Sequence, residues 1–170
     1  MLEAILAAVA LLLVYAGISD FRERRIPNWI PLSIFALYAA FLAGQYLLEL
    51  PSPALPLLGS LGVGAGVAVV FGALFALKYL GGGDVKLIAA MGFWAGPGLI
   101  LPFLLLMALS GGILALGFLA FDWASKKASG GQKGAPSSNR ERKKLKIPYG
   151  IAIAAAGLFV VNNILTFLLA

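Results

Sequence analysis

Residues 2–19 read LEAILAAVALLLVYAGIS, an apolar run whose single charge is Glu3 and which is followed directly by Asp20. A membrane-spanning helix needs about 20 mostly apolar residues, so this run has a suitable length. Its start carries an acid and no basic residue, whereas a cleaved signal peptide begins with positive charge. We therefore expect a retained membrane helix that leads into an aspartate.

The same pattern recurs along the chain. Of its 170 residues, 61% are hydrophobic and 12% are charged, a balance that does not fit the largely polar surface of a soluble domain. Breaks rich in charge, Pro or Gly separate further apolar runs. We predict an all-α, polytopic membrane protein that forms a single domain over residues 1–170. Its about six transmembrane helices are expected at 2–19, 29–48, 56–80, 85–97, 99–121 and 148–169.

Two features bear on how these helices pack. The run 85–97 is short for a complete span, because Pro97 and Gly98 follow it. We expect this helix to be tilted, shielded by protein or continuous with the next one. Gly62 and Gly66 have the GxxxG spacing that permits close helix packing, so we expect both at a helix contact.

The basic residues fall on alternate breaks between the runs. All 13 Lys and Arg residues lie in the segments 22–25, 78–86 and 126–146, while 49–55 and 95–98 contain none. With six spans, the three basic segments share one side of the membrane, which the positive-inside rule assigns to the cytoplasm. We expect a multi-pass protein of the cell (inner) membrane with both termini outside.

The net charge of +6 does not indicate nucleic acid, because the basic residues lie at membrane boundaries without interleaved aromatic residues. Anionic membrane lipid is their expected partner. Residues 124–146 are rich in Gly, Ser and Lys, so we expect a largely disordered cytoplasmic loop there. Nothing in the sequence indicates an oligomeric state.

The residue types limit the possible chemistry. The chain has no Cys and no His, which excludes thiol nucleophiles, Ser-His triads and thiolate or imidazole metal sites. The segment GGGD at 81–84 lacks the Gly-Lys-Ser/Thr ending of a phosphate-binding loop. We expect no metal ion and no other cofactor.

Asp20 and Asp84 differ in context from the other acids. Asp20 directly follows an apolar run, and Asp84 follows three glycines, which let backbones approach closely. Two predicted spans separate these aspartates, so both are expected at the cytoplasmic end of the bundle. Two carboxyl groups at a partly dry interface share a proton, as in aspartic proteases. The alternative is two unrelated helix-end acids that balance nearby Arg and Lys.

Three short motifs follow one another along the chain and bear on its function. Asp20 opens DFRERRIPN, the tetrad GGGD at 81–84 continues as VKL, and KIPYG lies at 146–150. Together they resemble the type IV prepilin peptidase family of GxGD membrane aspartyl proteases. The resemblance implies an endopeptidase that removes a short basic leader from type IV pilin-like precursors at the cytoplasmic membrane face. Asp20 and Asp84 would be its catalytic pair, and a prepilin-like membrane protein its substrate.

The remaining motif residues have both a functional and a structural interpretation. The two glycines shape the backbone around Asp84 or form a packing turn. The lysine biases the charge on Asp84 or extends to water at the membrane surface. The two prolines and the asparagine contact substrate or only start helices. These candidate substrate-binding or site-shaping residues are Gly81, Gly83, Lys86, Pro27, Asn28 and Pro148.

The chain departs from the longer, bifunctional members of that family. Those members carry an extra cytoplasmic region, often with four cysteines, and also methylate the new pilin N-terminus. Here only DFRERRIPN joins the first two helices, and Cys is absent. The resemblance therefore implies a peptidase-only form, without methyltransferase activity, similar to the short enzymes that process Tad or Flp prepilins or archaeal preflagellins.

Two other classes of function use the same residues differently. In a small cation- or proton-coupled transporter, Asp20 and Asp84 would bind or relay cations, as intramembrane acids often do. Such acids are expected near the midplane of broken helices, whereas both aspartates are predicted at the membrane edge. A structural assembly subunit without an active site would leave the paired motifs unexplained.

Overall fold

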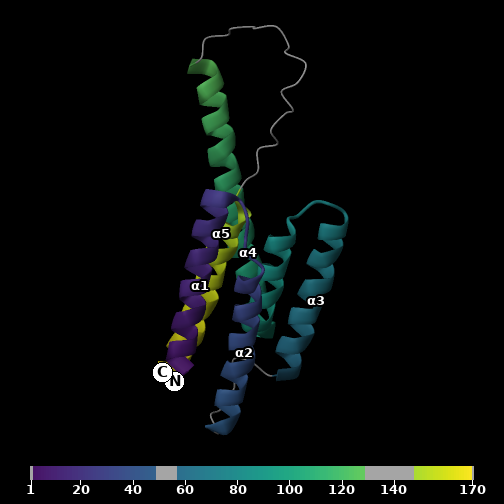
Figure 1. The fold of residues 1–170 in the computed structure, drawn as a ribbon, viewed down its shortest axis with the longest axis vertical. Coiled ribbons are helices and arrows are strands. Elements are labelled where there is room, and N and C mark those ends of the chain that lie inside the picture. The colour runs from purple at the N-terminus through teal and green to yellow at the C-terminus, as the bar shows by residue number, and fades with distance from the viewer. Residues whose placement is uncertain (1, 49–56, 129–147, 170) are drawn as a thin grey trace.

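The computed structural model describes residues 2–48, 57–128 and 148–169. The described residues form helices without strands, and five helices are long and apolar enough to cross a membrane. The prediction of an all-α, polytopic membrane protein is therefore confirmed (Figure 1). The helices are α1 (Leu2–Glu23), α2 (Trp29–Leu47), α3 (Leu57–Ala76), α4 (Gly82–Ala128) and α5 (Tyr149–Leu169).

Helix α4 is bent into two arms. The backbone of Gly96, at φ 54° and ψ −171°, is not helical, and Pro97 follows it. The first arm runs away from the α3–α4 connection, and the second arm returns past it and extends beyond the bundle (Figure 1). These arms correspond to the expected helices 85–97 and 99–121. The bend therefore reconciles the expected six runs with five helices.

The first arm of α4 is shielded by protein. This is one of the three expectations for the short run 85–97. An arm over residues 82–95 is roughly 21 Å long, shorter than the hydrocarbon core of about 30 Å. Helix α4 as a whole contacts α2, α3 and α5, and on its first arm the Trp94 indole N–H donates a hydrogen bond to the Ile34 carbonyl at 3.0 Å. The large side chains on this arm that are buried completely or almost so are Leu87, Ile88, Met91 and Trp94.

The prediction that Gly62 and Gly66 lie at a helix contact is wrong within the described part of the chain. A Cβ atom added at either glycine would meet nothing within 4 Å. Gly64 instead packs against the ring of Phe93, which a Cβ atom there would overlap. Residues two apart point to opposite sides of a helix. Because Gly64 faces Phe93, Gly62 and Gly66 face away from this contact.

Several helix ends differ from the sequence-based boundaries. Helix α1 continues to Glu23, so Asp20 lies in its last turn and not beyond it. Helix α3 ends at Ala76, four residues early. Helix α4 continues to Ala128 and takes in the first five residues of the expected loop 124–146. The rest of that loop and the connection 49–55 lie outside the described residues.

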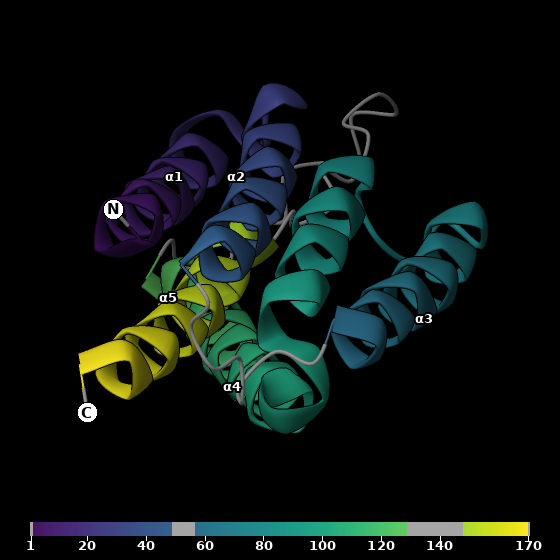
Figure 2. The ribbon, with the colours of Figure 1, turned by 90° about the horizontal axis from the view of Figure 1, so that it is seen from below.

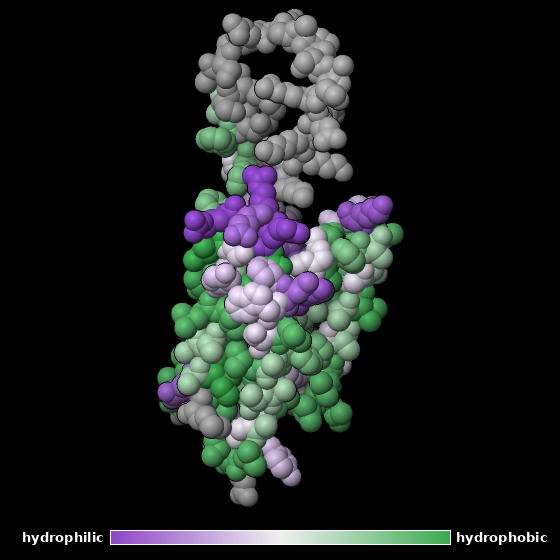
Figure 3. All heavy atoms as spheres, in the orientation of Figure 1, coloured by the Kyte–Doolittle hydropathy of each residue, from purple (hydrophilic) through white to green (hydrophobic). Residues whose placement is uncertain are grey.

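Hydrophilic side chains gather at one end of the bundle (Figure 3). Helix α1 ends there, and α4 and α5 begin there. We call it the acid end, because Asp20 and Asp84 lie at it. The start of α1 and the finish of α5 lie at the opposite end (Figure 1). Seen along the bundle, α3 lies at the outside against α4, and the first arm of α4 lies among the other helices (Figure 2).

Candidate active site

Asp20 is held between two helices. It lies in the last turn of α1 and is only 6% exposed. Its Oδ2 accepts a hydrogen bond from the backbone N–H of Gly150, at the start of α5, at 2.7 Å. Arg24 is near enough for its positive charge to act on the carboxyl group. A backbone donor on α5 therefore fixes one oxygen of Asp20 and leaves the other for a second partner.

The chain reverses sharply after α1. The Arg24 N–H donates to the Asp20 carbonyl at 2.9 Å, and the φ of Arg24 is 54°, the left-handed conformation typical of a residue just past a helix. The Ser19 hydroxyl donates to the Arg25 carbonyl at 2.9 Å. These bonds fold the segment after α1 back onto the acid end.

Gly83 lets this reversed segment approach the start of α4. A Cβ atom at Gly83 would lie 3.0 Å from the Cβ of Ile26 and 3.3 Å from its backbone oxygen. Ile26 is buried, and a backbone oxygen cannot move aside as a flexible side chain can. The glycine therefore brings the end of α1 next to the first turn of α4.

Asp84 lies in that first turn and is half-buried. Its carboxyl group accepts a hydrogen bond from the backbone of Gly81. A Cβ atom at Gly81 would lie 2.9 Å from the Asp84 Oδ2, so a larger residue would crowd the carboxyl group. The N-terminus of a helix also favours negative charge, because its N–H groups and dipole point toward that end.

The structure places the two aspartates within electrostatic range of each other, because the charge of Asp20 acts on Asp84. Both lie at the acid end, and neither lies near the middle of the bundle. Within the described ranges, no group of three or more His, Cys, Asp or Glu side chains is placed to hold a metal ion. The arrangement is a pair of carboxyl groups, each bound by one backbone N–H.

Gly150 is a site residue that the sequence analysis does not single out. A Cβ atom there would lie 2.7 Å from the Cβ and 2.8 Å from the Oδ2 of Asp20. Real Cβ atoms do not approach so closely, so only glycine allows the hydrogen bond to Asp20. The available signal is the last residue of KIPYG, the motif that also contains Pro148.

Lys86 and Asn28 form a second pair beside the aspartates. The Lys86 ammonium donates to the Asn28 Oδ1 at 2.9 Å, in an exposed position. Lys86 follows Asp84 by two residues and therefore leaves the helix on a different side. Both residues line a groove of about 430 Å³ between α2 and α4, together with Phe35 and Phe93.

The two prolines lie at helix starts. The Pro27 carbonyl accepts a hydrogen bond from the Ile30 N–H at 3.1 Å, and the Pro148 carbonyl accepts one from the Ile151 N–H at 3.4 Å. Asn28 precedes α2, but its side chain makes no capping hydrogen bond. The helix-start interpretation therefore accounts for the position of Asn28 and not for its amide, which binds Lys86 instead.

Two carboxyl groups in this arrangement are suited to acid–base chemistry. A pair that shares a proton presents one group that accepts a proton and one that donates it. The held oxygens keep both groups in fixed directions, and fixed geometry is what general acid–base catalysis requires. Water activation beside a polar bond is the reaction that fits these groups.

One comparison with known proteins indicates a peptidase. A family model described as the type IV leader peptidase family matches residues 7–116. That segment contains both aspartates and the glycines before Asp84, whereas Gly150 lies beyond it. Neither the curated proteins nor the solved structures gave a match.

Proposed function

The chain belongs to the type IV leader peptidase family, and on this premise we propose that it is an aspartic endopeptidase that cleaves the leader from type IV pilin-like precursors. Family membership and the five apolar helices indicate a leader-peptidase-like membrane protease. The aspartic mechanism and the substrate are the proposal. The observation that carries it is that Asp20 and Asp84 both lie at the acid end, where the charge of Asp20 acts on Asp84.

In the proposed reaction, one aspartate is ionised and the other is protonated. The ionised carboxylate takes a proton from water as the water oxygen attacks the scissile carbonyl carbon. The protonated carboxyl group then gives its proton to the leaving amide nitrogen, and the C–N bond breaks. The N–H groups of Gly150 and Gly81 each hold one carboxyl group, and in this proposal the remaining oxygens bind the attacking water.

The site is proposed to face the cytoplasm from the cell (inner) membrane, with both termini outside. The support is the cluster of basic residues beside Asp20, namely Arg22, Arg24 and Arg25, because positive loops stay on the cytoplasmic side. The substrate is a prepilin-like membrane protein. The short connection between α1 and α2 and the absence of Cys support a peptidase-only enzyme without methyltransferase activity.

The test compares purified full-length variants with candidate prepilins in detergent. Asp20→Asn and Asp84→Asn are each expected to abolish cleavage, because an amide keeps the shape of the carboxyl group but cannot take up the proton. The measurement is the appearance of a lower-mass pilin product. Glu23→Gln is the matched control, because Glu23 is an exposed acid in the same turn of α1, and it is expected to retain activity.

Accumulation of each variant in the membrane is measured alongside cleavage. Cleavage at the wild-type rate by either Asn variant contradicts the aspartic mechanism. Carboxylate substitutions that change ion flux, in a chain that cleaves none of the precursors, would favour the transporter. Inactive Asn variants that accumulate normally, beside an active Glu23→Gln variant, support the proposal.

A further inference from the structure

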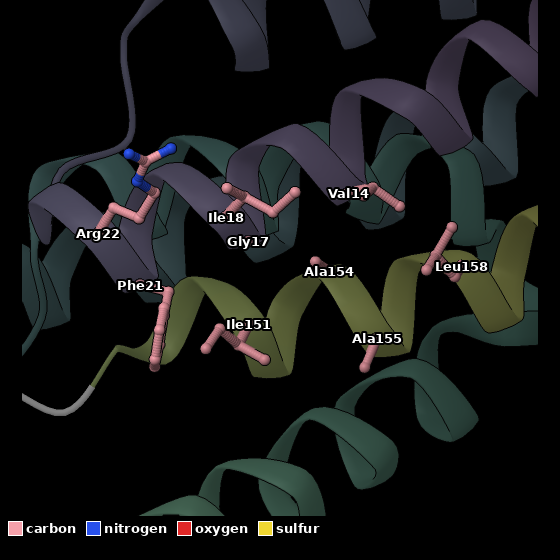
Figure 4. A pocket seen from close by; sticks show the side chains of 9 residues that line it. All are labelled: Val14, Gly17, Ile18, Phe21, Arg22, Ile151, Ala154, Ala155 and Leu158. Carbon is pink, nitrogen blue, oxygen red and sulfur yellow. The ribbon is translucent and has the colours of Figure 1, made fainter.

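The end of α1 that carries Asp20 is anchored on α5. A Cβ atom at Gly17 would lie 3.4 Å from the Cβ of Ala154, so the two helices meet through small residues. Figure 4 shows this contact beside an apolar groove, with Gly17 on α1 and Ala154 on α5. Together with the hydrogen bond from Gly150 to Asp20 at 2.7 Å, this contact fixes the last turns of α1 relative to α5.

Helix α4, which carries Asp84, is not packed against α1 in this way. Among the described helices, α1 packs mainly against α2 and α5, and α4 packs mainly against α2, α3 and α5. The pair formed by Asp20 and Asp84 therefore spans two helices that share no extensive contact. The relative position of the two carboxyl groups depends on what lies between these helix ends.

One peptide group lies between the residues that precede the two aspartates. Its carbonyl belongs to Arg25 and accepts the hydrogen bond from the Ser19 hydroxyl at 2.9 Å. Its nitrogen belongs to Ile26, and a Cβ atom at Gly83 would lie 3.5 Å from that nitrogen. Ser19 and Gly83 directly precede the two aspartates in the sequence. We call this group the 25–26 peptide.

The Ser19 hydroxyl fixes the 25–26 peptide from the α1 side. The side chains of Ser19 and Ile26 are both buried, and the hydrogen bond to the Arg25 carbonyl is partly buried. An alanine at position 19 would leave that carbonyl without this donor, which costs free energy that a shift of the peptide can recover. Any such shift is transmitted to Gly83, because its Cα lies against the same peptide.

We propose that Ser19 is a positioning residue that, through the 25–26 peptide, sets how closely the two aspartates approach each other. This inference rests on the proposed aspartic mechanism and deepens it. Two carboxyl groups share a proton only when they are near each other, and the charge of Asp20 already acts on Asp84 in this structure. Loss of the Ser19 hydroxyl should therefore slow the chemical step and leave substrate binding unchanged.

The test is steady-state cleavage of a prepilin by the purified full-length Ser19→Ala variant in detergent, at equal amounts of folded enzyme. We expect kcat to fall about tenfold and KM to stay within about twofold, because even a displacement below the roughly 1 Å that costs a hundredfold slows the reaction. A wild-type kcat, or a rise in KM that accounts for the whole loss, contradicts the role of Ser19.

Thr166→Val is the matched control for Ser19→Ala. The Thr166 hydroxyl also donates to a backbone carbonyl at 2.9 Å, that of Asn162, near the other end of α5. Valine removes this hydroxyl and keeps the branched shape of the side chain. The control should keep the wild-type kcat and KM, so that loss of a hydroxyl-to-carbonyl hydrogen bond as such does not explain the effect at Ser19.

A double variant tests whether Ser19 and Gly83 act through the same peptide. Gly83→Ala is expected to lower kcat as well, because its Cβ atom would lie 3.0 Å from the Cβ of Ile26. Effects within one network are not additive in free energy. The loss of kcat in the double variant should therefore be smaller than the product of the two single losses. Losses that multiply contradict the connection through the 25–26 peptide.

The Asp20→Asn and Asp84→Asn variants separate this inference from the proposed function. Wild-type cleavage by either of them would overturn the aspartic mechanism and, with it, the role of Ser19. Inactivity of both, beside a wild-type kcat in Ser19→Ala, would overturn the role of Ser19 alone. Inactivity of both, beside a lowered kcat and an unchanged KM in Ser19→Ala, supports the inference.

Discussion

At the scale of single residues, Gly150 decides where Asp20 lies. The 2.7 Å hydrogen bond from its N–H to Asp20 requires that no side chain stand between α5 and the carboxyl group. Gly150→Ala is therefore expected to displace Asp20. A displacement on the order of 1 Å can cost about a hundredfold in rate. We expect cleavage to fall by that factor, measured as the initial rate of leader removal from a prepilin.

Gly112→Ala is the control for this substitution. Gly112 is also a helical glycine, but a Cβ atom there would meet nothing within 4 Å. Alanine favours helix over glycine by up to about 1 kcal/mol, so this variant should keep its activity and fold at least as well. Equal activity in Gly150→Ala and wild type would mean that the Gly150 contact does not position Asp20.

At the scale of elements, the bend in α4 depends on Gly96. Its φ of 54° and ψ of −171° lie near a region that residues with a Cβ atom rarely occupy. Gly96→Ala is therefore expected to destabilise the protein by about 1 to 3 kcal/mol. The measurement is thermal unfolding in detergent, followed by tryptophan fluorescence, because Trp94 is buried two residues before the bend.

Gly98→Ala tests whether the loss of stability comes from the backbone conformation of Gly96 or from any alanine placed near the bend. Gly98 lies two residues further along, has no positive φ, and has open space where a Cβ atom would be. This variant should unfold at or above the wild-type temperature. If Gly96→Ala and Gly98→Ala unfold alike, the conformation assigned to Gly96 is wrong, and the two arms are joined differently.

At the scale of the whole molecule, the topology gives one prediction about sidedness. The chain has no Cys, so single-cysteine variants can be labelled without background. Arg25→Cys and Tyr79→Cys lie in exposed positions near the acid end, and Tyr46→Cys lies in an exposed position in the last turn of α2, at the opposite end of the bundle. An impermeant maleimide applied to intact cells should label only Tyr46→Cys, because basic segments remain in the cytoplasm.

Lysed cells provide the control, since all three thiols should then react. Labelling of Arg25→Cys and Tyr79→Cys in intact cells, with Tyr46→Cys protected, would reverse the proposed orientation. Labelling of Tyr46→Cys and Tyr79→Cys from the same side would contradict the crossing of the membrane by α3.

The composition and the lengths of the apolar runs predict the membrane class of this protein from its sequence. The membrane class follows from apolar runs such as residues 2–19, because hydrocarbon requires helices with satisfied backbone groups. The order of Asp20 and GGGD pointed to the chemistry and the family, since both motifs are local in the chain. The GxxxG expectation at Gly62 and Gly66 failed because spacing states that two small residues share a face, not which face meets a partner.

Contacts between distant segments of the chain emerge from the packing of the helices. Gly150 lies 130 residues from Asp20, and the residues next to Gly150 in the sequence do not indicate which side chain it packs against. The bend at Gly96 and the Lys86–Asn28 bond depend in the same way on helices that pack after they form. The apolar runs and the two aspartates are therefore visible in the sequence. How Asp20 and Asp84 are held depends on helix packing, because a hydrogen bond such as that from Gly150 to Asp20 needs both helices in place.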